Sequence, residues 1–245
     1  MEYSIILPTL NEKDHILDLI NSISDVLEKK KLIYEIIIVD DNSTDGTIDV
    51  VKSLLDKRDF LKLIVRSNLR KNLAQSINEG IKDAKYQNII WMDADFQHPP
   101  KYIDELTEKS KNFDVVICSR FLKKSERYFN DKKLEKDINE NQSYLYNKFC
   151  KFLLFQDITD YTSGYICIKK NIFNNFKLKG FYGDYFVSLI TYLKKNNYSV
   201  TEIPFKDELR ASGFSKTVVN VNIKYIYTCF RYILTLILNF LKKFT

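Results

Sequence analysis

Four short apolar runs alternate with amphipathic segments over roughly the first 100 residues, and this alternation restricts the fold more than any other feature. The runs are of strand length and cover residues 3–7, 34–39, 61–65 and 89–92. Between them, apolar residues recur at helical spacing in residues 16–27, 47–55 and 73–84. Strands that alternate with helices predict an α/β fold, in which helices flank both faces of a mostly parallel sheet.

The second half of the chain continues the pattern less regularly. Further strands and helices are predicted at residues 114–119, 143–155, 166–168, 184–193 and 199–204. Residues 121–142 are charged and show no clear period, so we expect a surface loop there.

Asparagines are expected to form several turns, because the chain has only 6 glycines. Asn42, Asn68 and Asn72 are candidates for left-handed backbone positions. Asn11 is expected to cap the helix over residues 16–27.

The composition narrows the class of protein. A chain of 245 residues can form one large α/β domain with an appendage. The net charge of +6 comes from dispersed lysines, which suits phosphate-bearing ligands or an anionic membrane better than nucleic acid. The cysteines show no metal-type spacing, which indicates free thiols in a reducing compartment. The chain opens on a strand without a secretory signal pattern, so we expect a cytoplasmic location.

Two carboxylates follow the apolar run at residues 89–92. The strand stops at Asp93, Ala94 and Asp95, and because residues two apart in a strand lie on the same face, we expect both carboxylates to point the same way from its end. At a separation of ~4–6 Å and an effective dielectric of ~20 they repel by a few kcal/mol. A shared proton, a nearby cation or a hard divalent metal can offset this repulsion, and Gln97 offers a further oxygen ligand. Two solvated acids at a strand end are the simpler alternative.

Three polar motifs fall at predicted strand ends. Pro8, Asp40 and Asp41 follow the first two strands, as Asp93 and Asp95 follow the fourth. In open parallel sheets, ligands bind beyond the carboxyl ends of the strands. The chain has no glycine-rich phosphate loop, so a metal held by carboxylates is the available means of binding phosphates at this acidic edge.

Residues 224–242 are strongly apolar. About 17 residues separate the two terminal lysines, which is short for a membrane span, and Arg231 lies between them. We expect a helix that lies in a membrane interface or docks on a partner's transmembrane helices. Packing on the protein's own core is the alternative. At helical spacing one narrow stripe collects the polar residues Lys224, Thr228, Arg231, Thr235, Asn239 and Lys242.

Seven motifs follow one another along roughly residues 3–216. They are LPTLNE (7–12), IIIVDDNSTDGT (36–47), MDADFQHPP (92–100), CSRF (118–121), DYTSGY (160–165), GDYF (183–186) and EIPFKDELRASGFSK (202–216). With these motifs in this order, the chain resembles the inverting family 2 glycosyltransferases of the GT-A fold. The resemblance is strongest to the branch containing dolichol-phosphate mannose synthase and bacterial polyprenyl-phosphate glycosyltransferases.

The resemblance implies roles for individual residues. The donor, a nucleotide-diphosphate sugar, would contact Pro8, Leu10, Glu12, Val39, Asp41, Asp93, Ala94, Asp95, Arg120, Arg210 and Lys216. Asp93, Asp95 and Gln97 would hold Mg²⁺ or Mn²⁺. Arg120 and Ser143 would bind the acceptor phosphate, and Asp95 and Arg120 would be the catalytic residues. The family often has an arginine four residues before this serine, where this chain has Asn139.

The implied reaction moves a hexose, with GDP-mannose the favoured donor, to a polyprenyl or dolichyl phosphate in one metal-assisted, inverting displacement. Residues 1–216 would form the catalytic GT-A domain. Residues 217–245 would form the helix that keeps the protein peripheral on the cytoplasmic face of a membrane.

Two other functions remain open. A family 2 transferase acting on a saccharide or protein hydroxyl would need a carboxylate base, for which Asp160 or Asp184 is the candidate. A non-catalytic subunit could keep the same fold. A nucleic-acid-binding domain is least favoured, because the sequence lacks a basic helix or stacking platform.

Overall fold

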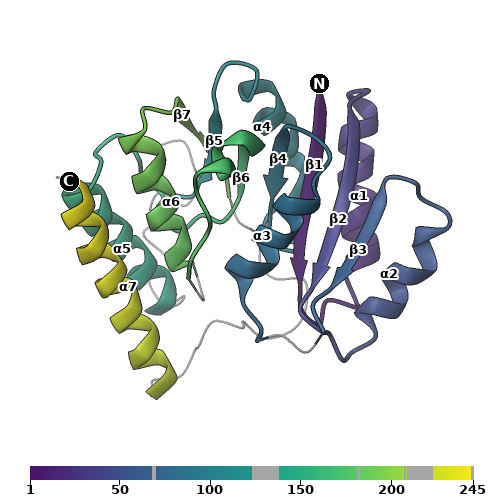
Figure 1. Ribbon diagram of the computed structural model, residues 1–245, viewed down its shortest axis with the longest axis horizontal. Helices are drawn as coiled ribbons and strands as arrows, with labels where there is room; N and C mark the ends of the chain where they lie inside the picture. Colours follow the sequence, from purple (N-terminus) through teal and green to yellow (C-terminus); the bar gives the residue numbers. More distant parts are fainter. Residues whose placement is uncertain (68–69, 123–137, 181–182, 207, 209–222, 244–245) are drawn as a thin grey trace, which may run out of the picture.

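The computed structural model describes residues 1–67, 70–122, 138–180, 183–206, 208 and 223–243 (Figure 1). Its sheet contains the strands β1 (Glu2–Thr9), β2 (Ile33–Asp40), β3 (Leu61–Val65), β4 (Asn88–Trp91), β5 (Val115–Ser119), β6 (Ile166–Lys169) and β7 (Val200–Pro204). The α-helices are α1 (Ile16–Lys29), α2 (Thr47–Leu55), α3 (Leu73–Asp83), α4 (Ile103–Lys109), α5 (Ile138–Leu153), α6 (Asp184–Lys195) and α7 (Ile223–Lys243). Short 3-10 turns lie at Pro100–Tyr102 and Lys170–Asn174.

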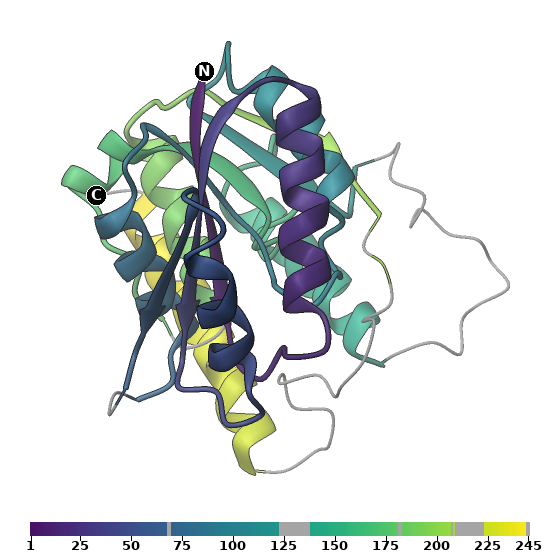
Figure 2. The ribbon, with the colours of Figure 1, turned by 90° about the vertical axis from the view of Figure 1, so that its right-hand side faces the viewer.

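The predicted α/β fold with a mostly parallel sheet is confirmed. The strand order is β3-β2-β1-β4-β6-β5-β7, and β6 alone pairs antiparallel, with β4 and β5. Helices cover both faces, and α1 and α7 lie on opposite sides of the sheet (Figure 2). The strands are continuous apolar runs because successive side chains enter the cores on the two faces: Ile5 and Leu7 face α1, whereas Ile6 faces α3.

Two of the predictions for asparagine turns are wrong. Asn11 does not cap α1; it has φ 56°, and its side-chain oxygen accepts the Thr44 N–H at 2.9 Å. Asn72 has φ −161° and caps α3 by accepting the Gln75 N–H at 3.0 Å. Asn42 is left-handed as predicted, with φ 59°, and Asn68 lies outside the described residues.

The predicted loop at 121–142 ends earlier than expected, because α5 begins at Ile138. Residues 139–142 are polar, so the sequence there gives no helical period of apolar residues. The signal comes later in the helix, where Cys150 enters the core. Residues 123–137 lie outside the described part of the chain.

The C-terminal helix α7 lies beside α6 and α5 at one end of the molecule (Figure 1). Its polar stripe faces the protein: Arg231 pairs with Asp184, and Asn239 donates to Ser188 Oγ at 3.1 Å. Its outer face is apolar and includes Phe230, which is 59% exposed. Within the described residues, no helix combines the length and apolar character needed to cross a bilayer.

Candidate active site

The loops after β1 and β2 are hydrogen-bonded into one unit at the carboxyl edge of the sheet. The Asn11 N–H donates to Ser43 Oγ at 2.8 Å, and the Glu12 N–H donates to Thr47 Oγ1 at 2.9 Å. Asp40, which is fully buried, accepts from the Ser43 N–H at 2.7 Å. These bonds hold the 8–12 segment against the 40–47 loop.

The residues expected to contact the nucleotide meet at this edge. Pro8 stands opposite Val39 in the β1–β2 register, and Glu12 and Asp41 are buried beyond the strand ends. Leu10 is partly buried. The Val39 side chain lies in the hydrophobic core, so only its backbone can face a ligand.

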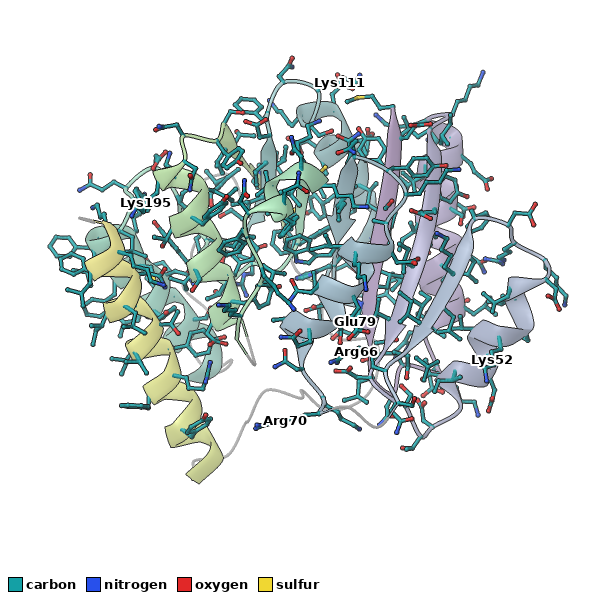
Figure 3. The ribbon with its side chains drawn as sticks, in the orientation of Figure 1. Lys52, Arg66, Arg70, Glu79, Lys111 and Lys195 are labelled. Carbon is teal, nitrogen blue, oxygen red and sulfur yellow. The ribbon has the colours of Figure 1, made fainter. Side chains whose placement is uncertain are left out.

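Arg66 is a residue of this candidate site that the sequence analysis did not single out. It directly follows β3, is 4% exposed, and forms ion pairs with Asp41 and with Glu79, the latter at 2.9 Å (Figure 3). Asp41 also accepts the Asn72 N–H at 2.8 Å. Arg66 therefore fixes the Asp41 carboxylate. A lone basic residue directly after an apolar run was the available signal.

Asp93 and Asp95 lie in a loop and not in a strand, because β4 ends at Trp91. The Asp93 N–H donates to His98 Nδ1 at 2.9 Å, and Asp95 Oδ1 accepts the Gln97 N–H at 3.0 Å. The alternation expected for a strand therefore does not orient the two carboxylates. Asp95 is 2% exposed, whereas the Asp93 side chain is 44% exposed.

The 93–98 loop is held in an uncommon backbone conformation. Phe96 has φ 63°, a left-handed angle that is uncommon and costly for an aromatic residue. The buried His98 ring stacks on Tyr165 with centroids 5.0 Å apart, which braces the loop. Ala94 is nearly buried beside the two acids.

The residues of the 93–98 loop suit a hard divalent cation. Two carboxylates and the Gln97 amide offer oxygen ligands, which Mg²⁺ and Mn²⁺ prefer. Among the described residues, no three His, Cys, Asp or Glu side chains form a metal-binding cluster. The described side chains of this loop therefore leave coordination positions for further oxygens, such as those of a diphosphate.

Arg210 and Lys216 lie outside the described residues. The chain approaches them from the 93–98 loop, because the Glu208 N–H donates to the Gln97 carbonyl at 3.2 Å. Lys101 pairs with the Glu208 carboxylate at 3.1 Å. The segment that carries the two cations thus starts beside Gln97.

Arg120 follows β5 and forms a two-point ion pair with Asp160. Nε and Nη2 donate to Asp160 at 2.8 and 2.9 Å, and Nη2 also donates to Thr162 Oγ1 at 2.8 Å. Asp160 is completely buried. Burial acts to raise the pKa of Asp160, but the Arg120 charge and its hydrogen bonds hold this pKa below its ordinary value.

Ser143 and Asn147 of α5 join the Arg120 pair through Thr162. The Ser143 hydroxyl lies 3.5 Å from Thr162 Oγ1, and Asn147 Nδ2 donates to the same oxygen at 2.9 Å. Ser143 and Arg120, both expected at the acceptor phosphate, therefore share one hydrogen-bond network.

Glu202 supports the Asp160 loop from β7. It accepts the Asp160 N–H at 3.0 Å, the Thr159 N–H at 2.9 Å and the Thr159 hydroxyl at 2.7 Å. Burial raises the pKa of Glu202 to about 7, although these hydrogen bonds act to lower it.

Replacing Glu202 with glutamine should change how stability depends on pH. The folded protein holds the Glu202 proton more tightly than the unfolded chain, so the unfolding free energy of the wild type falls as pH rises from about 4.5 to about 7. Glu202→Gln lacks this titration. We expect the unfolding free energy of the variant, relative to that of the wild type, to be about 1–3 kcal/mol higher at pH 8 than at pH 5. Urea unfolding at the two pH values measures this difference. Parallel pH dependences would contradict the raised pKa.

Comparison with known proteins identifies the family. The model described as Glycosyl transferase family 2 matches residues 4–176. A dolichol-phosphate mannosyltransferase from Pyrococcus furiosus is 32% identical over 236 residues, which cover 94% of this chain and 63% of that protein. A protein of the same name from Saccharomyces cerevisiae is 35% identical over 125 residues, which cover 49% of this chain and 45% of that protein. The chain thus spans less than two thirds of either relative.

Solved structures share the fold. Glucosyl-3-phosphoglycerate synthase from Mycobacterium tuberculosis, in complex with Mn²⁺, UDP and glucosyl-3-phosphoglycerate, matches with a TM-score of 0.70 at 15% identity, over 97% of this chain and 79% of that one. A mannosyltransferase from Pyrobaculum calidifontis, in complex with GDP-Man and Mn²⁺, matches with a TM-score of 0.59 at 18% identity, over 98% of this chain and 63% of that one. The family model covers well over half of the sequence. The chain therefore belongs to glycosyl transferase family 2.

Proposed function

We propose that this protein transfers a hexose from a nucleotide-diphosphate sugar to a polyprenyl phosphate, with inversion at the anomeric carbon. The observation that supports the proposal is the Arg120–Asp160 pair, which shares a hydrogen-bond network with Ser143, so that the two residues expected at the acceptor phosphate lie together. GDP-mannose is the favoured donor, in line with the names of the two relatives.

The donor would lie across the edge formed by the 8–12 segment, Asp41 and the 93–98 loop. Asp93, Asp95 and Gln97 would hold Mg²⁺ or Mn²⁺, which when bound neutralises charge on the leaving diphosphate. Arg210 and Lys216 would close over the donor phosphates with charge-assisted hydrogen bonds.

A phosphate acceptor removes the need for a general base. Its second pKa is near 6, so the attacking oxygen is already anionic at neutral pH. This oxygen would bond to the anomeric carbon as the bond to the diphosphate oxygen breaks. Arg120 and Ser143 would place the phosphate, while His98 Nδ1 accepts the Asp93 N–H and supports the loop.

The alternative acceptor, a saccharide hydroxyl, is less well supported. It would need Asp160 or Asp184 as a base, but Asp160 is bound by Arg120 and Asp184 by Arg231 at 2.8 Å. Both carboxylates are almost completely buried. A carboxylate held by an arginine is a poor proton acceptor, because the pair favours its charged form.

An apolar surface on α5 and α7 would place the protein on a membrane. We call it the outer apolar face; Phe152 is its most exposed member, at 76%. Lysines occur in the last turns of α6 and α7, where Lys195 donates to the Lys242 carbonyl, and positive charge near such a face suits anionic lipid headgroups. A peripheral position on the cytoplasmic side of a bilayer fits this face. It comprises Leu145, Phe149, Phe152, Phe230, Ile233, Leu234, Ile237, Leu238 and Leu241.

A donor screen tests the proposed function. Purified protein in detergent with Mn²⁺ and a short polyprenyl phosphate is given GDP-mannose, UDP-glucose or UDP-GlcNAc, and the lipid product is weighed by mass spectrometry. We expect a hexosyl polyprenyl phosphate from GDP-mannose. Transfer to simple sugars and not to the lipid would favour the hydroxyl acceptor, and the absence of both transfer and slow donor hydrolysis would favour a non-catalytic subunit.

A further inference from the structure

The first turn of α6 is bound to α7 by a buried ion pair. Asp184, the first residue of α6, is 1% exposed, and its Oδ2 accepts Arg231 Nη2 at 2.8 Å. A Cβ atom at Gly183 would lie 2.7 Å from the Tyr232 hydroxyl, so Tyr232 packs directly against the backbone there. Two adjacent residues of α7 therefore hold two adjacent residues at the start of α6.

Tyr232 also joins α7 to the Arg120 network. The Tyr146 hydroxyl of α5 donates to the Tyr232 carbonyl at 3.0 Å, and the two rings meet edge to face with centroids 5.1 Å apart. Tyr146 is adjacent in sequence to Asn147, which binds Thr162. Burial raises the pKa of Tyr232, Asp184 raises it further and Arg120 lowers it, so the hydroxyl experiences both charges.

The same turn of α6 also lies near the 93–98 loop. A Cβ atom at Gly164 would lie 3.8 Å from the Tyr185 hydroxyl and 3.7 Å from His98 Cε1. Burial raises the pKa of Tyr185, and the Asp93 carboxylate adds to the increase. Tyr185 at the start of α6 therefore lies close to the 93–98 loop, while the preceding residues Gly183 and Asp184 contact α7.

We propose that Arg231 and Tyr232 are positioning residues of the transfer site. They hold the first turn of α6, and this turn fixes the distance between the 93–98 loop and the Arg120 network. The helix α7, which carries much of the outer apolar face, is then also part of the transfer site. Its removal should therefore reduce transfer even where membrane binding is not needed. This inference rests on the proposed function for its link to the acceptor.

The test uses the full chain in detergent with a short polyprenyl phosphate, so that membrane binding does not limit the rate. Arg231→Met leaves the buried Asp184 charge unpaired and can unfold the protein. The double variant Arg231→Met/Asp184→Asn removes both charges and should fold. We expect its kcat for transfer to fall by about 10–100-fold with donor KM within about twofold of wild type. Arg231→Lys should recover part of the loss.

A control variant lies on the opposite side of the sheet from α7. Asp25→Asn changes an exposed acidic residue of α1 that has no part in the site, and it should transfer at the wild-type rate in detergent. Wild-type kcat in the folded double variant would overturn the proposal.

Hydrogen exchange gives a readout that does not depend on the acceptor. In the double variant, amides of residues 93–98 and 158–165 should exchange about tenfold faster or more, because the α6 turn no longer holds them. Unchanged exchange would overturn the positioning role. A wild-type protein that makes no lipid product would instead overturn the proposed acceptor, and exchange would still decide the role of Arg231.

Discussion

Asp95→Asn should reduce sugar transfer by about 10³-fold while the protein remains folded. The substitution removes one of the two carboxylate charges available to a divalent cation. An asparagine oxygen can still accept the Gln97 N–H that Asp95 accepts at 3.0 Å, so the loop should keep its shape. Steady-state transfer at saturating Mn²⁺ measures the effect, and circular dichroism checks the fold.

Asp49→Asn is the matched control for Asp95→Asn. Asp49 is an exposed acid in the first turn of α2, so its replacement changes the net charge equally and should leave transfer unchanged. Excess chelator should abolish transfer by the wild type. Full activity of Asp95→Asn, or of the wild type in chelator, would rule out a metal-dependent site at the 93–98 loop.

Arg120→Met should both destabilise the protein and remove transfer to a phosphate acceptor. It leaves Asp160, which is completely buried, as an unpaired charge. Such a loss typically lowers the unfolding free energy by about 3–5 kcal/mol. This is a large part of the ~5–15 kcal/mol that stabilises a typical domain, so urea denaturation will detect it.

A double variant separates the two effects of Arg120. Arg120→Met/Asp160→Asn removes both charges and should recover most of the stability, since no buried charge remains unpaired. It should still fail to transfer, because no cation then places the acceptor phosphate. Wild-type transfer by the stable double variant would show that Arg120 has no part in binding the acceptor.

The elements that the sequence predicted best are those with a strong local signal. The apolar run at residues 61–65 and the helix at 47–55 coincide with β3 and α2. The strand-and-helix alternation was sufficient for the α/β class, because burial on both faces requires continuous apolar strands. Polar turns were harder to predict: Asn11 accepts the Thr44 N–H and the Asn72 N–H donates to Asp41, and both partners lie far away in the sequence.

The supporting contacts of the site could not be read from the sequence. Arg231 and Asp184 are 47 residues apart, and Arg120 and Asp160 are 40 apart, so no local period connects them. Periodicity also left the orientation of α7 undecided. It shows which residues share a face, but not that the polar stripe faces α6 while the apolar face points outward.

A crystal soaked with GDP-mannose and Mn²⁺ tests the central claim most directly, through the anomalous signal of manganese. We predict a manganese peak between the Asp95 carboxylate and the pyrophosphate of the donor, with Asp93 or Gln97 turned toward it. A donor bound at the sheet edge with no manganese, and with the side chains of Asp93 and Asp95 turned away from its phosphates, would contradict the account.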